Sequence, residues 1–329
     1  MSNWEFVEPT LKFNPKSGQA SERQLRIFRQ TVDEYDHKIV NIAEINDTVK
    51  NQIRLAISEA VERARRCLLV LTNQDTLELL ETIVGKIDKG VILFKEELYP
   101  LILKPNFKLS KAKQKILARF FGDNTQAIID SLNSFYDLAS DKYKTSYSHG
   151  YIFRMVLMTT ILGLNLKKVG VILSRSQQGS YGASYTNWPS GWKLPIPAAG
   201  TVTFPAYELL EGLRRGSKNM DEGYIQANII YAETPDTSFE PIFMPGGVFR
   251  NSDYFTLTYI HECTHLFAST SDSYYFEKPW ENDGITTGAD NENDEFGLDG
   301  KPLTTRCLLN ADSYAWLIYL LGDSKYTDS

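Results

Sequence analysis

The stretch YFTLTYIHECTHLFASTSDSYYF, residues 254 to 276, decides how this chain is to be interpreted. It has no glycine or proline before Ala268, and its apolar residues are compatible with a mostly buried helix that begins near Ser252. The chain has only four histidines, and His261 and His265 both lie in this segment. On a helix they are one turn apart on one face, so both imidazoles can reach a single cation.

Glu262 directly follows the first histidine and lies about 100° round the helix from it. From there its carboxylate can address a water beside the cation without being a ligand itself. Cys263 points away from that face. In an H-E-x-x-H site two neutral imidazoles hold the metal, the metal acidifies a water, and the glutamate takes its proton. The segment therefore predicts a catalytic zinc site with ligands His261 and His265 and general base Glu262, against the alternative that two structural histidines share this spacing by chance.

A catalytic zinc site needs a third protein ligand. No histidine follows at HxxGxxH spacing, so carboxylates remain, and the candidates are Asp272, Glu277, Glu281 and Glu292. Glycines crowd the sequence around the last of these, which disfavours a rigid helix there. The acidic run at 277–299 is instead predicted to be a solvated loop.

Composition limits the classes of protein to consider. The chain has 329 residues, of which 42% are hydrophobic, so it can bury a sizeable core as a globular protein. Its formal net charge is −6, and it has no basic block with interleaved aromatic residues. Nucleic acid and anionic membranes are therefore not expected partners, and protein or peptide substrates are.

The sequence carries no recognisable export or membrane signal. The first residues lack the basic start and apolar run of a secretory signal, and the longest apolar stretch, MVLMTTILGLNL at 155–166, is too short to span a bilayer. Cys67, Cys263 and Cys307 are an odd number without CxxC spacing, so we expect three free thiols. We expect synthesis in the cytoplasm, with any export by a non-classical or specialised secretion route.

Helical patterns dominate the first half of the chain. From Asp47, taken as the N-cap, apolar residues recur at helical spacing to about Leu71. Two further helices are predicted at 111–121 and 124–140, with a break at Gly122.

Other segments are less regular. A short charged helix is predicted at 20–39, and the apolar segment 150–175 fits either a buried helix or a strand. Residues 177–200, rich in glycine, proline and tryptophan, are predicted to form a long loop that could contact a protein partner. ANIIYAE at 227–233 and PIFMPGGVF at 241–249 have the β-branched and aromatic content of short strands.

Two elements downstream of the histidines resemble a known family. STSDSYYF at 269–276 is similar to the GTxDxxYG element that follows HExxH in the deuterolysin and peptidyl-Lys metalloendopeptidase family, the aspzincins. LNADSYAWL at 309–317 resembles the NADSY-type C-terminal helix of these enzymes. Both glycines of the first element are replaced, by Ser269 and Phe276, and Ala315 stands where the peptidyl-Lys enzymes carry a glutamate.

The resemblance implies a fold. It covers residues 47–329 and implies an α+β, mainly helical, zincin-like metallopeptidase domain with a small sheet and an HExxH active-site helix. An insertion at about 140–222 and an N-terminal extension of unclear role at 1–46 complete the expected organisation.

The resemblance also implies roles for three residues. Asp272 falls on the third zinc ligand, and Tyr275 falls on the tyrosine that donates a hydrogen bond to the developing oxyanion. Asp312 falls at the pocket for the residue after the cut, where it favours a basic side chain. An aspartate early in a helix can equally be a cap or support a zinc-binding histidine.

The prediction for the whole chain is a zinc-dependent metalloendopeptidase with one catalytic Zn²⁺, in which a metal-activated water hydrolyses a peptide bond. The peptide is expected to lie extended along an edge strand near 239–249. The alternative is a non-catalytic, zinc-stabilised protein-binding module. A delivered toxin or effector is a further hypothesis that rests only on the missing signal and the unpaired cysteines.

Overall fold

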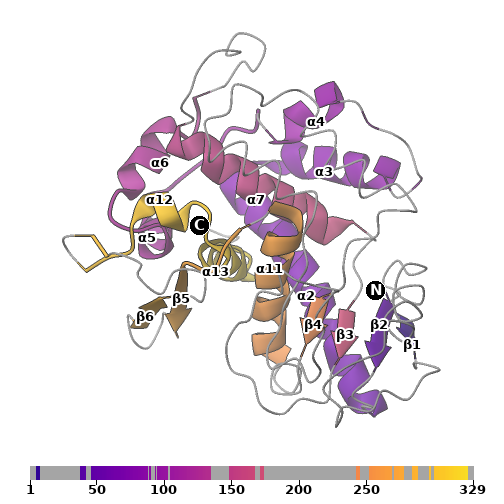
Figure 1. Ribbon diagram of the computed structural model, residues 1–329. Helices are drawn as coiled ribbons and strands as arrows, with labels where there is room; N and C mark the ends of the chain where they lie inside the picture. Colours follow the sequence, from indigo (N-terminus) through magenta and orange to yellow (C-terminus); the bar gives the residue numbers. More distant parts are fainter. Residues whose placement is uncertain are drawn as a thin grey trace, which may run out of the picture.

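Helices make up most of the chain that is described here, and two small sheets accompany them (Figure 1). The computed structural model describes residues 5–7, 38–41, 46–87, 89, 93, 95–102, 104–134, 148–166, 171–173, 242–244, 252–268, 270–277, 284–287, 296–297 and 300–324.

The elements follow one another along the chain in this order. They are β1 (Glu5–Val7), β2 (Lys38–Asn41), α2 (Asp47–Leu71), α3 (Gln74–Ile87), α4 (Lys95–Ile102), α5 (Lys111–Phe120), α6 (Thr125–Ser131), α7 (His149–Asn165), β3 (Val171–Leu173), β4 (Ile242–Met244), α11 (Ser252–Ala268), β5 (Tyr274–Glu277), β6 (Gly284–Thr287), α12 (Thr304–Cys307) and α13 (Ala311–Leu321).

The ends of α2 follow from its sequence. The Asn46 side chain accepts a hydrogen bond from the backbone N–H three residues on, at 3.1 Å, so Asn46 is the N-cap and the prediction of Asp47 in that role is wrong by one residue. At the other end Thr72 donates its backbone N–H and its hydroxyl to the Leu68 carbonyl. The predicted end at Leu71 is confirmed.

Helix α11 lies at the centre of the described helices. Helices α2, α7 and α13 each pack against it, and α2 also packs against α7 and α13. Buried residues occupy almost every side of α7 and α13, which explains their nearly continuous apolar sequences. Gly163 of α7 permits the close approach to α11, because a Cβ there would lie 2.1 Å from the Phe267 ring. The helix that carries the histidines is therefore held on several sides.

The two sheets lie on either side of α11 in Figure 1. β1 to β4 are parallel and pair in the order β1-β2-β3-β4, which places β4 at one edge of the described sheet and against α11. β5 and β6 are antiparallel, and β5 packs on α13. β4 confirms the strand predicted inside 241–249. The prediction of a mainly helical fold with a small sheet is also confirmed, whereas the zincin-like domain stays a prediction.

One predicted helix is too long. The segment 124–140 forms α6 only as far as Ser131. The Leu132 carbonyl accepts a hydrogen bond from the Arg154 guanidinium. The Asn133 side-chain amide bonds to the backbone N–H and carbonyl of Phe107. After Ser131 the backbone forms a turn, in which the Ser134 N–H donates to the Ser131 carbonyl at 3.1 Å. The preceding break is confirmed, because Gly122 has φ +80°.

Three segments contain strands that the local pattern did not specify. Lys38 and Ile39, at the end of the predicted charged helix 20–39, belong to β2 instead. The segment 150–175 contains both of the predicted alternatives, α7 and then β3. The acidic run 277–299 is not loop throughout, since it contains β6, which pairs with β5. In each case the strand is three or four residues long and depends on a partner elsewhere in the chain.

Several predictions fall outside the described residues. They concern the loop at 177–200, the strand at 227–233 and most of the extension at 1–46. Cys67, Cys263 and Cys307 are buried and form no disulfide, as predicted. Of the helices described, none is long and apolar enough to cross a membrane.

Candidate metal centre

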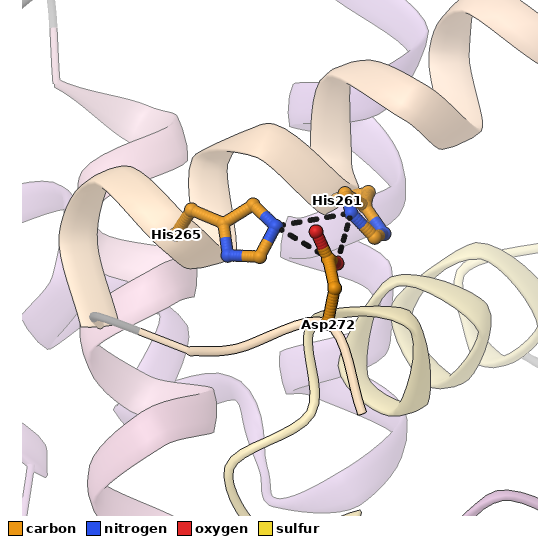
Figure 2. A group of neighbouring side chains, drawn as sticks. All are labelled: His261, His265 and Asp272. Atoms are coloured by element: carbon orange, nitrogen blue, oxygen red, sulfur yellow. Dashed lines mark hydrogen bonds and ion pairs between the residues drawn. The ribbon is translucent and has the colours of Figure 1, made fainter. Parts of the chain in front are cut away.

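Helix α11 presents its two histidines one turn apart, as the sequence predicts (Figure 2). The helix is fixed by burial of Phe255, Tyr259 and Ile260, and by the Thr256 hydroxyl, which donates to the Ala56 carbonyl of α2 at 3.1 Å. A histidine pair on a helix anchored in this way has little freedom to separate.

The loop after α11 returns the chain past the two imidazoles. The backbone N–H of Ser271 donates to the Leu309 carbonyl at 2.7 Å, and the N–H of Ala311 donates to the Ser271 carbonyl at 2.9 Å. This short parallel bridge fixes the loop to the start of α13. Asp272 comes next in the chain, and its side chain points back at the histidines (Figure 2).

Three acceptor atoms converge at this place. Asp272 Oδ1 lies 3.1 Å from His261 Nε2 and 3.2 Å from His265 Nε2, and the two nitrogens lie 3.1 Å apart. Ligand atoms bound to one zinc ion at about 2.1 Å in tetrahedral geometry are about 3.4 Å apart. The triangle therefore has nearly the dimensions of one face of a zinc coordination tetrahedron. No other group of histidine, cysteine and carboxylate ligands of this kind occurs among the described residues.

The outer nitrogens of both imidazoles have hydrogen-bond partners, and these assign the tautomers. His265 Nδ1 lies 2.8 Å from the Thr270 backbone oxygen, which can only accept, so this nitrogen carries the proton. His261 Nδ1 lies 3.1 Å from Asp312 Oδ1 and donates in the same way. Both Nε2 lone pairs therefore face Asp272, and acceptors at this spacing repel one another unless a proton or a cation lies between them.

Two threonines support the second histidine. The Thr264 hydroxyl donates to the His261 carbonyl at 2.8 Å, so the Thr270 hydroxyl is the donor in the 2.7 Å contact between the two threonines. Thr270 Oγ1 also lies 3.2 Å from His265 Nδ1. The chain of bonds joins the loop to the helix at the ligand itself. Sequence reasoning did not identify either threonine.

Glu262 is buried beside the cluster, with 4% of its surface exposed. Its Oε2 atom has no hydrogen-bond partner within the described part of the chain. Burial raises the pKa of this carboxyl, while the neighbouring imidazolium charges of His261 and His265 oppose that rise. A buried carboxylate oxygen without a hydrogen-bond partner can accept a proton.

Tyr275 lies against the same cluster. Its ring is stacked on that of His261, with centroids 6.0 Å apart and 24° between planes, and its hydroxyl bonds to Asp272. Burial, and then the charge of Asp272, raise the pKa of the phenol. Tyr275 is therefore a neutral hydrogen-bond donor throughout the physiological pH range.

The ligands themselves share charge and protons. Burial lowers the pKa of His261, but hydrogen bonds to Asp272 and Asp312 outweigh it and leave that pKa well above its usual value. Burial likewise opposes protonation of His265, and the charge of Asp272 raises its pKa. Burial would raise the pKa of Asp272, yet the imidazolium charge of His265 and bonds from both rings hold it well below its usual range. Protons on the two imidazoles would therefore compete with a cation for the same ligand atoms.

Asn310 is a further residue that the sequence prediction did not identify. It is fully buried, and its Oδ1 accepts from the backbone N–H groups of Ser273 and Tyr274, both at 3.0 Å. Its Nδ2 donates to the Tyr274 carbonyl at 2.9 Å and to Ser313 Oγ at 3.0 Å. An asparagine just before a helix predicts an N-cap, whereas here its side chain clamps the ligand loop onto α13.

The structure brings together most of the residues that the sequence singled out. His261, Glu262, His265, Asp272, Tyr275 and Asp312 all lie in one cluster. Of the other candidates for the third ligand, Glu281, Glu292 and the side chain of Glu277 fall outside the described residues.

Comparisons with protein-family models, with curated proteins and with solved structures found no match to this chain. The resemblance to the aspzincins, the zinc ion and the peptidase activity therefore remain predictions, which rest on the sequence motifs and on the His261, His265 and Asp272 cluster.

Proposed function

We propose that this chain is a zinc-dependent metalloendopeptidase. The observation that carries the proposal is the convergence of His261 Nε2, His265 Nε2 and Asp272 Oδ1 within 3.2 Å of one another, with the open carboxylate of Glu262 beside them. Three protein ligands leave one tetrahedral position for a water or substrate, as in catalytic zinc sites.

The donor set suits zinc chemically. Two imidazole nitrogens and one carboxylate oxygen are ligands that catalytic zinc sites use, and both imidazoles are held in the tautomer that presents Nε2. The same set also occurs in non-haem iron sites. The Glu262 Oε2 atom, which has no hydrogen-bond partner among the described residues, favours hydrolysis, since hydrolysis needs a base at the metal.

A zinc ion held there would supply Lewis-acid chemistry by acidifying a water and polarising the scissile carbonyl. Glu262 would take one proton from the attacking water and pass it to the leaving amine nitrogen as the C–N bond breaks. The hydroxyl of that water stays on the acyl carbon, which becomes the new carboxyl group. The raised pKa of Glu262 suits a group that must both accept and return a proton near neutral pH.

Tyr275 supplies a hydrogen bond to the developing oxyanion in this proposal. Its phenol remains protonated, its ring is braced on His261, and its hydroxyl is already next to the ligand Asp272. Removal of one such donor in other acyl-transfer enzymes costs about 10²–10³ in kcat.

A protein or peptide substrate fits the surroundings of α11. β4 is an edge strand of the described sheet and contacts α11. An extended peptide could add main-chain hydrogen bonds to such an edge, next to the helix that carries the histidines. This supports the predicted substrate strand near 239–249.

The zinc-stabilised binding module remains the second candidate because of one observation. His261 and Asp272 are only 7% and 4% exposed, a degree of burial that structural zinc sites also show. Structural sites close their fourth position with a protein ligand, and Glu262 is the nearby carboxylate. The two functions therefore differ in whether Glu262 binds the metal or a water.

The test compares zinc-loaded wild type with Glu262→Gln on a diverse peptide library read by mass spectrometry. Metal content is measured by elemental analysis, with a chelator-treated sample as control. We expect one zinc per chain in both proteins, cleavage by wild type alone, and a loss of about 10²–10⁴ in rate for the variant. Equal zinc content with no cleavage by either protein would favour the binding module. Loss of zinc in Glu262→Gln would make Glu262 a ligand, and iron in place of zinc would overturn the proposal.

A further inference from the structure

Asp312 is held at both oxygens by the protein. Oδ1 lies 3.1 Å from His261 Nδ1, and Oδ2 accepts a hydrogen bond from the backbone N–H of Phe276 at 2.7 Å. The residue is buried, with 8% of its surface exposed. It lies in the first turn of α13, so its carboxylate joins three elements, α13, α11 and β5.

The bond from Oδ1 acts on the first metal ligand. A carboxylate at Nδ1 keeps the proton on that nitrogen, leaves the Nε2 lone pair for the metal, and makes the imidazole a stronger donor. The two histidines differ in this respect, because His265 donates to the neutral carbonyl of Thr270. Only His261 has an anion behind it.

The bond from Oδ2 acts on the strand that follows the third ligand. Phe276 is next in the chain to Tyr275, and its ring packs edge-on against Phe120 at 5.2 Å. The N–H bond therefore fixes β5 at one side of Tyr275, while the stack on His261 fixes the phenol ring itself. The Asp312 carboxylate therefore orients the His261 imidazole and holds β5, the strand that carries Tyr275.

We propose that Asp312 is a positioning residue of the metal centre, which holds His261 and β5 in register, and that it does not serve as the anion that receives a basic substrate side chain. This inference rests on the proposed function, since it assumes that the cluster binds a metal. A substrate ammonium or guanidinium would have to reach a carboxylate that is 8% exposed and compete with the hydrogen bonds from His261 and Phe276.

The experiment measures metal binding apart from catalysis. Zinc affinity is determined by competition with a chromophoric chelator for wild type, Asp312→Ala, Asp312→Asn and the control Ser313→Ala. Ser313 is the next residue of α13, is fully buried, and accepts from Asn310. The absorption spectrum of the Co²⁺-loaded proteins reports the ligand geometry.

We expect Asp312→Ala to weaken zinc binding by about 10–100-fold and to change the Co²⁺ spectrum. Asp312→Asn should weaken zinc binding less than Asp312→Ala does. Its amide oxygen still accepts from His261, although its NH₂ group cannot accept from the Phe276 N–H. Ser313→Ala should stay within about twofold of wild type. At saturating zinc, the residue preferred after the cut should be the same in wild type and both Asp312 variants.

Wild-type zinc affinity and an unchanged Co²⁺ spectrum in Asp312→Ala, with a changed preference after the cut, would overturn the inference in favour of a specificity pocket. If wild type binds zinc but cleaves nothing, the peptidase proposal fails and the affinity comparison still decides the role of Asp312. If wild type binds no metal, both fail. Far-UV circular dichroism checks folding, and Asp312→Asn carries the comparison if the alanine variant does not fold.

Discussion

Replacement of Asn310 by alanine tests whether the loop that carries Asp272 is held by α13. The Asn310 side chain makes four hydrogen bonds at 2.9–3.0 Å, and three of them go to the backbone of Ser273 and Tyr274. Alanine removes all four from a fully buried place. The segment then keeps its backbone bridge between Ser271 and the start of α13, the bond from the Ser271 hydroxyl to the Leu309 carbonyl, and the bond from the Phe276 N–H to Asp312.

The expected loss follows from the number of bonds. A buried hydrogen bond contributes about 1 kcal/mol net, so four contribute about 4 kcal/mol. With a urea m-value of about 3 kcal/mol/M, the unfolding midpoint should fall by roughly 1 M. Ser313→Ala is the matched control, since it removes only one of the four bonds and should cost about 1 kcal/mol.

Urea unfolding is followed for wild type, Asn310→Ala and Ser313→Ala in the presence of a chelator, and zinc affinity is measured in parallel. Zinc affinity of Asn310→Ala should fall by at least about tenfold, because the residue orients the segment next to the third ligand. Loss of one bond corresponds to a shift of about 0.3 M in the midpoint. An Asn310→Ala midpoint within about 0.3 M of wild type, or equal to that of Ser313→Ala, would refute the clamp. Unchanged zinc affinity in a destabilised variant would show that the loop holds Asp272 without Asn310.

Two further predictions concern pH and the turn at Gly122. Without metal, the raised pKa values of His261 and His265 stabilise the fold below the unfolded pKa of about 6.5, and this stabilisation is lost as pH rises through the folded pKa values. The lowered pKa of Asp272 stabilises the fold above about pH 4. The urea midpoint in chelator should therefore fall as pH rises above about 6.5, and saturating zinc should reverse the trend, since bound metal needs neutral imidazoles. A midpoint that rises with pH in chelator would contradict the assigned hydrogen bonds. Gly122→Ala should destabilise the protein by about 2 kcal/mol or more, because φ is +80° and a Cβ would lie 2.1 Å from the Pro302 carbonyl oxygen; a thermal midpoint equal to that of wild type would exclude this steric account.

Local periodicity was sufficient where a helix carries its own signals. The span of α2 to Leu71 and the span of α11 from Ser252 to Ala268 follow from apolar spacing and from the absence of breakers, and both are confirmed. The histidine face of α11 follows from the same geometry. These features need only neighbouring residues in the chain.

The rest of the site depends on contacts that no local pattern contains. The two oxygens of Asp312 bond to residues 51 and 36 positions away, and Asn310 bonds to residues 36 and 37 positions away. An N-cap and a clamp have the same sequence, because both are an asparagine before a helix. The short strand β2 was missed for a similar reason, since its partners are β1 and β3, far from it in the chain.

The dependence of the centre on α13 has a consequence for biosynthesis. Helices α2, α7 and α11 precede residue 269, so a growing chain presents both histidines to the cell well before Asn310 and Asp312 leave the ribosome. Until then the loop lacks its hydrogen bonds to Asn310, and His261 Nδ1 lacks its hydrogen bond to Asp312. Metal capture at full affinity, and with it the proposed hydrolytic activity, would thus be delayed until α13 has been made and has docked.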